Sequence, residues 1–91
     1  NSRLLVVEFT AGWSEPCKAM KPTFEGFASQ FEDSADFCTV NVEVNELQTL
    51  ARELKVQTLP TFLLAKSGKV VKSVVDAKGA ELRSSIEALK K

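Results

Sequence analysis

Trp13-Ser14-Glu15-Pro16-Cys17-Lys18 is the stretch that decides how this chain folds. It stands between the apolar run Leu4 to Phe9, which has the length of a buried strand, and an amphipathic segment that ends near Phe31. A strand that leads through a loop into a helix leaves free backbone N–H groups, and the positive end of the helix dipole, beside the first helical residues. We therefore expect any chemistry of this protein to lie in this stretch.

The sequence indicates where the helix that follows begins and which of its faces is buried. Serine is a favoured N-cap, which suits Ser14, and a proline in the first helical turn, as at Pro16, loses no hydrogen bond. Pro22 lies inside the helix and is expected to kink it. Apolar residues at spacings of three and four predict one buried face of the core, and not a cofactor site, from Met20, Phe24, Phe27, Ala28 and Phe31.

The rest of the chain predicts three more strands and two more helices. The strands are expected at Phe37 to Val44, Phe62 to Ala65 and Val70 to Val75, with a hairpin turn at Lys66-Ser67-Gly68-Lys69 between the last two. A capping box of Asn45 and Gln48 is expected to open a short helix, and a final helix is expected from about Lys78. The order βαβαββα predicts a single α/β domain over residues 1–91, with a parallel strand pair and an antiparallel hairpin.

Charge and hydropathy exclude several classes of function. The 12 basic and 12 acidic residues balance, so we expect neither nucleic acid nor an anionic membrane as a partner. The apolar runs are no longer than strands, and no signal peptide is visible. The expected localisation is cytoplasmic, or a matrix-like compartment.

The two cysteines, Cys17 and Cys38, are predicted to remain free thiols. Cys17 follows the end of the first strand and Cys38 opens the next, which in a parallel pair puts them about 15 Å apart, beyond the ~7 Å limit for a disulfide. The chain has no histidine, and two distant cysteines cannot build a zinc or iron–sulfur site. We expect no cofactor and no metal.

Three stretches of the sequence together resemble the thioredoxin family: Trp13 to Lys18, Leu59-Pro60-Thr61-Phe62 and Gly68-Lys69-Val70-Val71. The family's site reads Trp-Cys-Gly-Pro-Cys-Lys, and the h-type thioredoxins of plants look closest. The resemblance implies the thioredoxin fold, here without the family's N-terminal strand and helix. The strand from Phe37 to Val44 would then be an unprotected edge of the sheet, which a second copy or a larger assembly is expected to cover.

The resemblance also implies roles for single residues. In the family, the first cysteine attacks a target disulfide and the second resolves the mixed disulfide. Ser14 stands at the attacking position and Cys17 at the resolving one. Glu8 stands where the family has a buried Asp that handles the proton of the second cysteine, and Asn41 replaces a Lys that pairs with that acid. Asp76 replaces a Gly in the loop that flanks the site.

The resemblance also implies which residues bind the substrate: Trp13, Pro16, Leu59, Pro60 and the Asp76 loop. A cis peptide bond between Leu59 and Pro60 is implied, which leaves the Leu59 backbone open to pair with an extended peptide of a partner protein beside Trp13.

Several residues keep a second interpretation from the sequence alone. Ser14 is either a plain N-cap or a specific hydrogen-bonding group, and Cys17 is either a buried, inert thiol or one that reacts with small disulfides or glutathione. Glu8 is either buried or solvated at the end of its strand. Cys38 is expected in the core, where free cysteine is common.

Three functions follow from these alternatives, and enzymatic activity stays open among them. The favoured one is a redox-deficient module that binds an extended peptide. The second is a thioredoxin-type disulfide oxidoreductase or isomerase that acts through Cys17 alone. The third is an ordinary thioredoxin with an engineered serine at position 14, although Glu8, Glu15 and Asp76 also depart from the family pattern.

Overall fold

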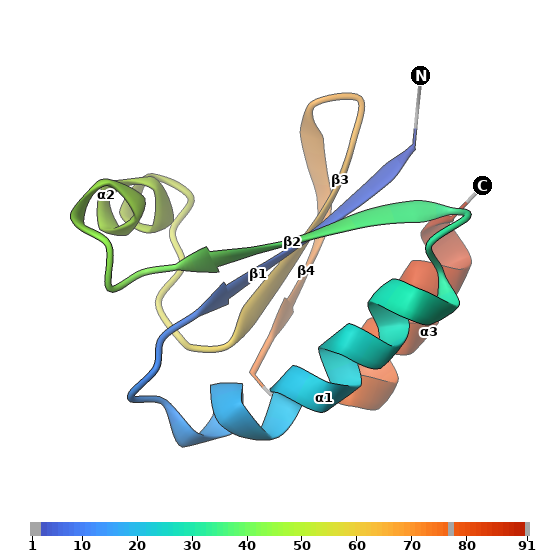
Figure 1. Cartoon of the computed structure of the whole chain (residues 1–91). Helices are drawn as coiled ribbons and strands as arrows, with labels where there is room; N and C mark the ends of the chain where they lie inside the picture. The colour runs from blue at the N-terminus through green and yellow to red at the C-terminus, as the bar shows by residue number, and fades with distance from the viewer. Residues whose placement is uncertain (1–2, 77, 91) are drawn as a thin grey trace.

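The computed structural model of the protein describes residues 3–76 and 78–90 (Figure 1). Its strands and helices follow the predicted order βαβαββα, which is confirmed. They are β1 (Leu4–Thr10), α1 (Glu15–Gln30), β2 (Ala35–Asn41), α2 (Asn45–Glu53), β3 (Thr61–Lys66), β4 (Lys69–Val75) and α3 (Gly79–Leu89).

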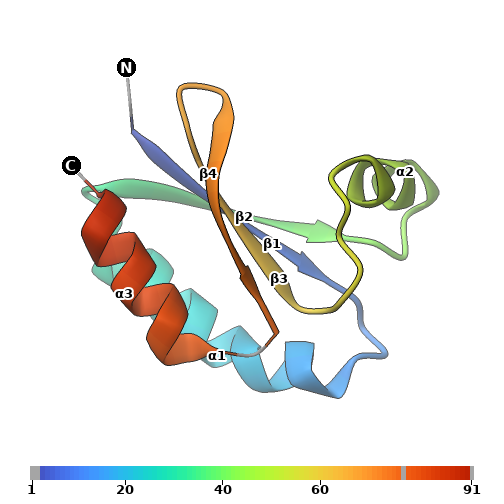
Figure 2. The ribbon, with the colours of Figure 1, turned by 180° about the vertical axis from the view of Figure 1, so that it is seen from behind.

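The four strands form one mixed sheet in the order β2-β1-β3-β4. β1 runs parallel to β2 and antiparallel to β3, and β3 pairs with β4 as an antiparallel hairpin. α1 and α3 lie together on one face of the sheet, and α2 lies on the other (Figures 1 and 2). β1 is central in the sheet and lies between helices on both faces, which suits its continuous apolar run, although Leu5 is exposed.

The larger core lies between the sheet and the helices α1 and α3. The four large side chains of the predicted stripe are buried there and Ala28 is partly buried. The ring of Phe24 packs 5.7 Å from that of Phe62 and 5.6 Å from that of Phe37, measured between centroids. The α2 face holds a smaller cluster, in which Phe9, Ala51 and Leu63 are buried and the surrounding valines are only partly covered. The two faces of the sheet are therefore unequally sealed.

The second strand and second helix differ from the expected bounds. β2 starts at Ala35 and ends at Asn41, because its partner β1 ends at Thr10, which pairs with Asn41. The predicted capping box is wrong. Asn45 is already helical, Val44 is the N-cap without a side-chain hydrogen bond, and the Asn41 side chain accepts the Glu43 N–H at 2.8 Å.

The hairpin turn is confirmed, with left-handed backbone at Ser67 (φ 53°) and Gly68 (φ 81°). Two consecutive positive φ values are typical of a two-residue hairpin turn whose twist matches that of the strands. A register shift between Leu64 and Ala65 follows in the β3–β4 pairing.

β2 forms one edge of the sheet, with β1 on one side only among the described residues. The prediction that Cys38 lies in the core is wrong, because Cys38 is exposed. Its face of the strand is covered by α2 only near the end of β2, where Val40 and Val42 pack against the small cluster (Figure 1). Residues 3–76 and 78–90 contain no helix that is both long and apolar enough to cross a bilayer.

Candidate functional site

Ser14 is the N-cap of α1, as predicted. Its backbone is extended (φ −91°, ψ 116°), and its Oγ accepts the Cys17 N–H at 3.4 Å. Its own N–H donates to the carbonyl of Ala11 at 3.2 Å, which closes the turn between β1 and the helix. The residue is only 5% exposed, so its hydroxyl faces the helix and not the solvent.

Cys17 lies one turn into α1 and is 3% exposed, in agreement with the prediction of a largely buried thiol. It lines a cavity of about 360 Å³ together with Glu8, Thr39 and Asn41. Glu8 is 5% exposed, which agrees with its interpretation as a buried acid and not as a solvated one. A thiol and a carboxyl group thus line the same partly open pocket behind the helix N-terminus.

Burial raises the pKa of Glu8, because the charged carboxylate loses its hydration. Thr39 Oγ1 donates to Glu8 Oε1 at 3.4 Å and lowers this pKa, whereas the negative charge of Glu25 raises it. Thr39 is paired with Glu8 in the parallel β1–β2 register. Asn41, the expected partner position, instead hydrogen-bonds the Glu43 backbone.

Trp13 and Leu59 lie on the outer side of the site, whereas Pro60, which was also expected to bind substrate, is fully buried. Trp13 is 69% exposed, and the peptide bond between Leu59 and Pro60 is cis, as the resemblance implied. Asp76 has a left-handed backbone (φ 78°), which explains why the family pattern has glycine there, and aspartate is one of the residues that tolerates it. The Asp76 N–H donates to the Pro60 carbonyl at 2.8 Å and joins the two loops.

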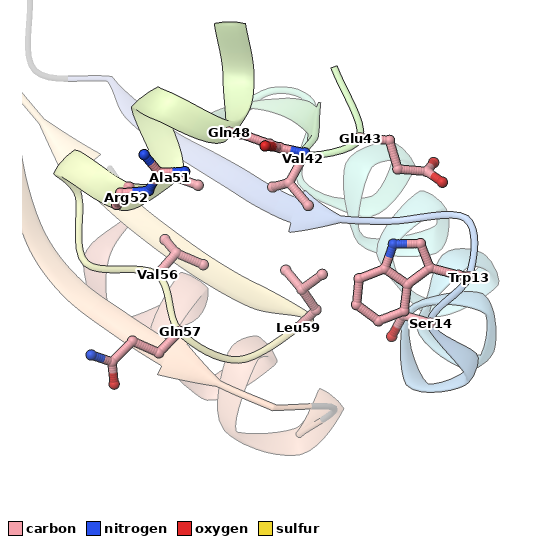
Figure 3. Close-up of a pocket in the computed structure, with 10 residues that line it drawn as sticks. All are labelled: Trp13, Ser14, Val42, Glu43, Gln48, Ala51, Arg52, Val56, Gln57 and Leu59. Carbon is pink, nitrogen blue, oxygen red and sulfur yellow. The ribbon is translucent and has the colours of Figure 1, made fainter. Parts of the chain in front are cut away.

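Beside Trp13 runs a groove of about 610 Å³ between the site and α2 (Figure 3). Its apolar wall comes from Val42, Ala51, Val56, Leu59 and Trp13, and its polar wall from Ser14, Glu43, Gln48, Arg52 and Gln57. Ser14 therefore borders the groove on one side while Cys17 borders the inner cavity. Pro16 is exposed and lines neither of these two spaces.

The two cysteines are free, as predicted, and lie on different elements. Cys38 is exposed on β2, and its partial burial raises the pKa of its thiol, since the thiolate is less well hydrated there. No group of three or more His, Cys, Asp or Glu side chains is placed to hold a metal within the described part of the chain.

Glu43, Arg52 and Thr39 border the site without having been predicted from the sequence. Glu43 follows the end of β2, and the carboxyl ends of the parallel strands β1 and β2 meet at one edge of the sheet. That edge is where ligands bind in open α/β sheets, which is the signal that points to Glu43. The Gly12 N–H donates to Glu43 Oε1 at 3.0 Å.

Comparisons with known proteins show the family to which this fold belongs. The thioredoxin family model matches residues 1–88. Thioredoxin H4 of Arabidopsis thaliana is 40% identical over 86 residues, which are 94% of this chain and 71% of that protein. Thioredoxin H2-2 of Oryza sativa subsp. japonica is 40% identical over 85 residues, which are 93% of this chain and 61% of that protein.

Among solved structures, thioredoxin NaTrxh from Nicotiana alata is similar with a TM-score of 0.92 and 42% identity, over 98% of this chain and 75% of that one. The α/β fold, the exposed tryptophan and the cis-proline loop define a domain of the thioredoxin type. The chain belongs to the thioredoxin family, and h-type thioredoxins of plants are among its similar relatives.

Proposed function

We propose that this domain holds an extended segment of a partner protein beside Trp13 and does not itself reduce disulfides through a pair of thiols. The observation that carries the proposal is Ser14, whose buried hydroxyl caps the N–H of Cys17 where the family pattern places the attacking cysteine. A serine alkoxide is too basic to form at neutral pH, and a hydroxyl makes no disulfide with Cys17.

Cys38 offers no substitute for the missing thiol. It is exposed on β2, and the sheet pairs it with Val7, two residues back from Phe9 and away from the helix N-terminus. A disulfide needs Cα atoms within about 7 Å, which the position of Cys38 does not provide for Cys17.

The binding surface retains the features that suit an extended peptide. Trp13 presents a large aromatic surface to solvent, and Leu59 and Val56 line the groove next to it (Figure 3). Buried aromatic anchors supply much of the affinity in protein interfaces. We propose a cytoplasmic protein partner and neither nucleic acid nor a membrane, and association of a second copy or a larger assembly along β2.

The insulin-reduction assay tests the absence of dithiol activity. With dithiothreitol as electron donor, we expect the protein to precipitate the insulin B chain no faster than dithiothreitol alone. Turnover well above that background would overturn the proposal. Peptide binding is tested by ¹⁵N spectra of the protein with extended peptides, in which Trp13→Ala should abolish the shifts at Leu59.

A second candidate is favoured by the cavity that Cys17 shares with Glu8. In this alternative, the Cys17 thiolate attacks a glutathione mixed disulfide, forms a new disulfide with glutathione and releases the target as a thiolate. Iodoacetamide labelling separates the two: we expect Cys17 to react slowly in the native state and faster after unfolding, with Cys38 as the exposed reference thiol. Labelling of Cys17 at the rate of a free thiol would favour the single-thiol enzyme.

The origin of Ser14 is a separate question. The family comparisons fit equally well an ordinary thioredoxin in which serine replaces cysteine at position 14. The codon at position 14 in the source genome decides between a natural serine and an introduced one.

A further inference from the structure

The groove beside Trp13 carries opposite charges at its two ends (Figure 3). Glu43 lies at the Trp13 end, on the connection between β2 and α2, and Arg52 lies at the other end, in the last turn of α2. Between them the lining is mostly apolar, with Val56 and Leu59, and includes the uncharged Gln48. A segment that binds here has to match a pattern of charge as well as a shape.

The Glu43 carboxylate is positioned by the loop that precedes the helix. Its Oε1 accepts the Gly12 N–H at 3.0 Å, and a Cβ atom at position 12 would lie only 3.2 Å from that oxygen, so glycine permits the close approach. A carboxylate has about four acceptor positions, so one N–H leaves it able to accept an ammonium or guanidinium group as well. The indole of Trp13 would add a cation–π contact to a basic side chain bound there.

The length of α2 gives the approximate separation between the backbone that follows Glu43 and that of Arg52. From Asn45 to Arg52 the helix rises about 11 Å at 1.5 Å per residue. An extended peptide spans about 13 Å in four residues, and every second side chain points to the same side. Residues i, i+2 and i+4 of such a peptide therefore reach the Glu43 end, the apolar middle and the Arg52 end.

We propose that the groove recognises an extended segment of a partner protein with a basic, an apolar and an acidic side chain at alternate positions. This inference rests on the proposed function, because it assumes that the groove binds a peptide. The basic side chain pairs with Glu43 over Trp13, the apolar one packs against Leu59 and Val56, and the acidic one pairs with Arg52. The order of charges fixes the direction in which the segment lies.

Three synthetic peptides with identical Gly-Ser flanks test the inference by titration into the ¹⁵N-labelled protein. Their centres read Arg-Ser-Leu-Ser-Glu, Glu-Ser-Leu-Ser-Glu and Arg-Ser-Leu-Ser-Arg. We expect the first to bind about 3- to 10-fold more tightly than the second and about 2- to 5-fold more tightly than the third, since the ion pairs are partly exposed. Both preferences should shrink between about 0.05 and 0.5 M salt, where screening shortens the range of charge interactions.

Charge-neutral variants assign each preference to its residue. Glu43→Gln keeps an oxygen for the Gly12 N–H and should make the first two peptides bind equally, whereas Arg52→Gln should equalise the first and third. Glu46→Gln, an exposed position of α2 outside the groove, should change neither ratio.

If all three peptides bind equally tightly and Trp13→Ala weakens their binding, the charge selection is overturned but peptide binding by the groove is not. The absence of shifts with every peptide would overturn the inference together with the proposed function.

Discussion

Ser14 and Glu8 are the two residues whose functional groups determine the chemistry of the site. Ser14 contributes a hydroxyl where a thiol would carry out exchange chemistry, and this hydroxyl satisfies the Cys17 N–H at the helix start. Glu8 contributes a carboxyl group that is buried beside the Cys17 thiol. Both can be changed by isosteric substitution, which leaves the surrounding packing in place.

Ser14→Cys is expected to restore only weak insulin reduction. The backbone should accept the change, because loss of the cap costs about 0.5–2 kcal/mol, and the helix N-terminus should bring the pKa of the new thiol below the ~8.5 of a free cysteine. Three features limit the activity: position 14 is 5% exposed, Glu15 adds a negative charge, and Asn41 gives Glu8 no cationic partner.

The control for this variant is Ser14→Ala, which removes the cap without adding a thiol. Insulin reduction by Ser14→Cys at the level of an ordinary thioredoxin would mean that Ser14 is the only defect and that the site is otherwise intact. A folded variant that readily forms the disulfide with Cys17 but reduces no insulin would mean that the neighbouring groups limit activity even more than we expect.

Glu8→Gln is expected to stabilise the protein at neutral pH more than at acid pH. Burial raises the pKa of Glu8 above its ordinary value of 4.5, so the folded state binds a proton that the unfolded state has already lost. The free energy of unfolding of the native protein therefore falls as pH rises from near 4.5 through the raised pKa, and the glutamine variant lacks this decrease. Urea unfolding at several pH values measures the difference, with the exposed Glu53→Gln as control; a difference that does not change with pH would contradict the buried acid.

At the level of the elements, the two edges of the sheet are protected differently. β4 carries the exposed lysines Lys69 and Lys72, and charged lysines on an edge strand discourage pairing with another chain. β2 has no lysine or arginine between Ala35 and Asn41, and its exposed cysteine lies in the middle of the strand. We therefore expect β2 to be the edge at which a further strand pairs.

Cys38→Lys is expected to suppress association along β2. For the native protein we expect the apparent mass in sedimentation equilibrium to rise with concentration, and for the variant we expect a monomer at every concentration. Ser73→Lys adds the same charge to the other edge, at an exposed position of β4, and should leave the association unchanged. A native protein that stays monomeric, with fast amide exchange confined to β2, would count against association.

The sequence predicted the elements well where a periodic pattern was uninterrupted. The stripe of α1 and the Ser67-Gly68 turn came out as expected, because a helix face and a two-residue turn are local features. The end of β2 and the capping of α2 did not, because they depend on where β1 stops and on the start of α2 at Asn45, which makes Val44 the N-cap. The Thr39 contact with Glu8 needed the register between two strands, which no single stretch contains.

In the molecule as a whole, the sheet separates a well-sealed core from a shallower one. Leu64 is fully buried between the sheet and the pair α1 and α3, whereas Leu63, one residue earlier, faces α2 and partly covered valines. The exposure of Cys38 follows from this inequality, since its face of β2 is the shallower one. The general preference of cysteine for the core could not predict it, because that preference does not say how far α2 extends over the sheet.

Leu64→Ala is expected to cost more stability than Leu63→Ala. Replacing a buried leucine by alanine costs about 2–5 kcal/mol, and the loss is largest where the surroundings cannot collapse into the space. We expect the upper half of that range for Leu64 and the lower half for Leu63. Urea unfolding with an unchanged m-value measures both, and equal losses would mean that the two faces are equally well packed.

The turn of the β3–β4 hairpin is also a suitable position for inserting a tag. Thr61 begins β3 next to the groove and Lys66 ends it, so the turn at Ser67 and Gly68 lies about 17 Å away along the strand (Figure 2). An epitope or a surface-coupling tag inserted there, with an Asn-Gly pair to keep the left-handed backbone, would leave the Trp13 side untouched. Protein attached to a sensor chip through this turn would present every groove to the flowing sample in the same orientation.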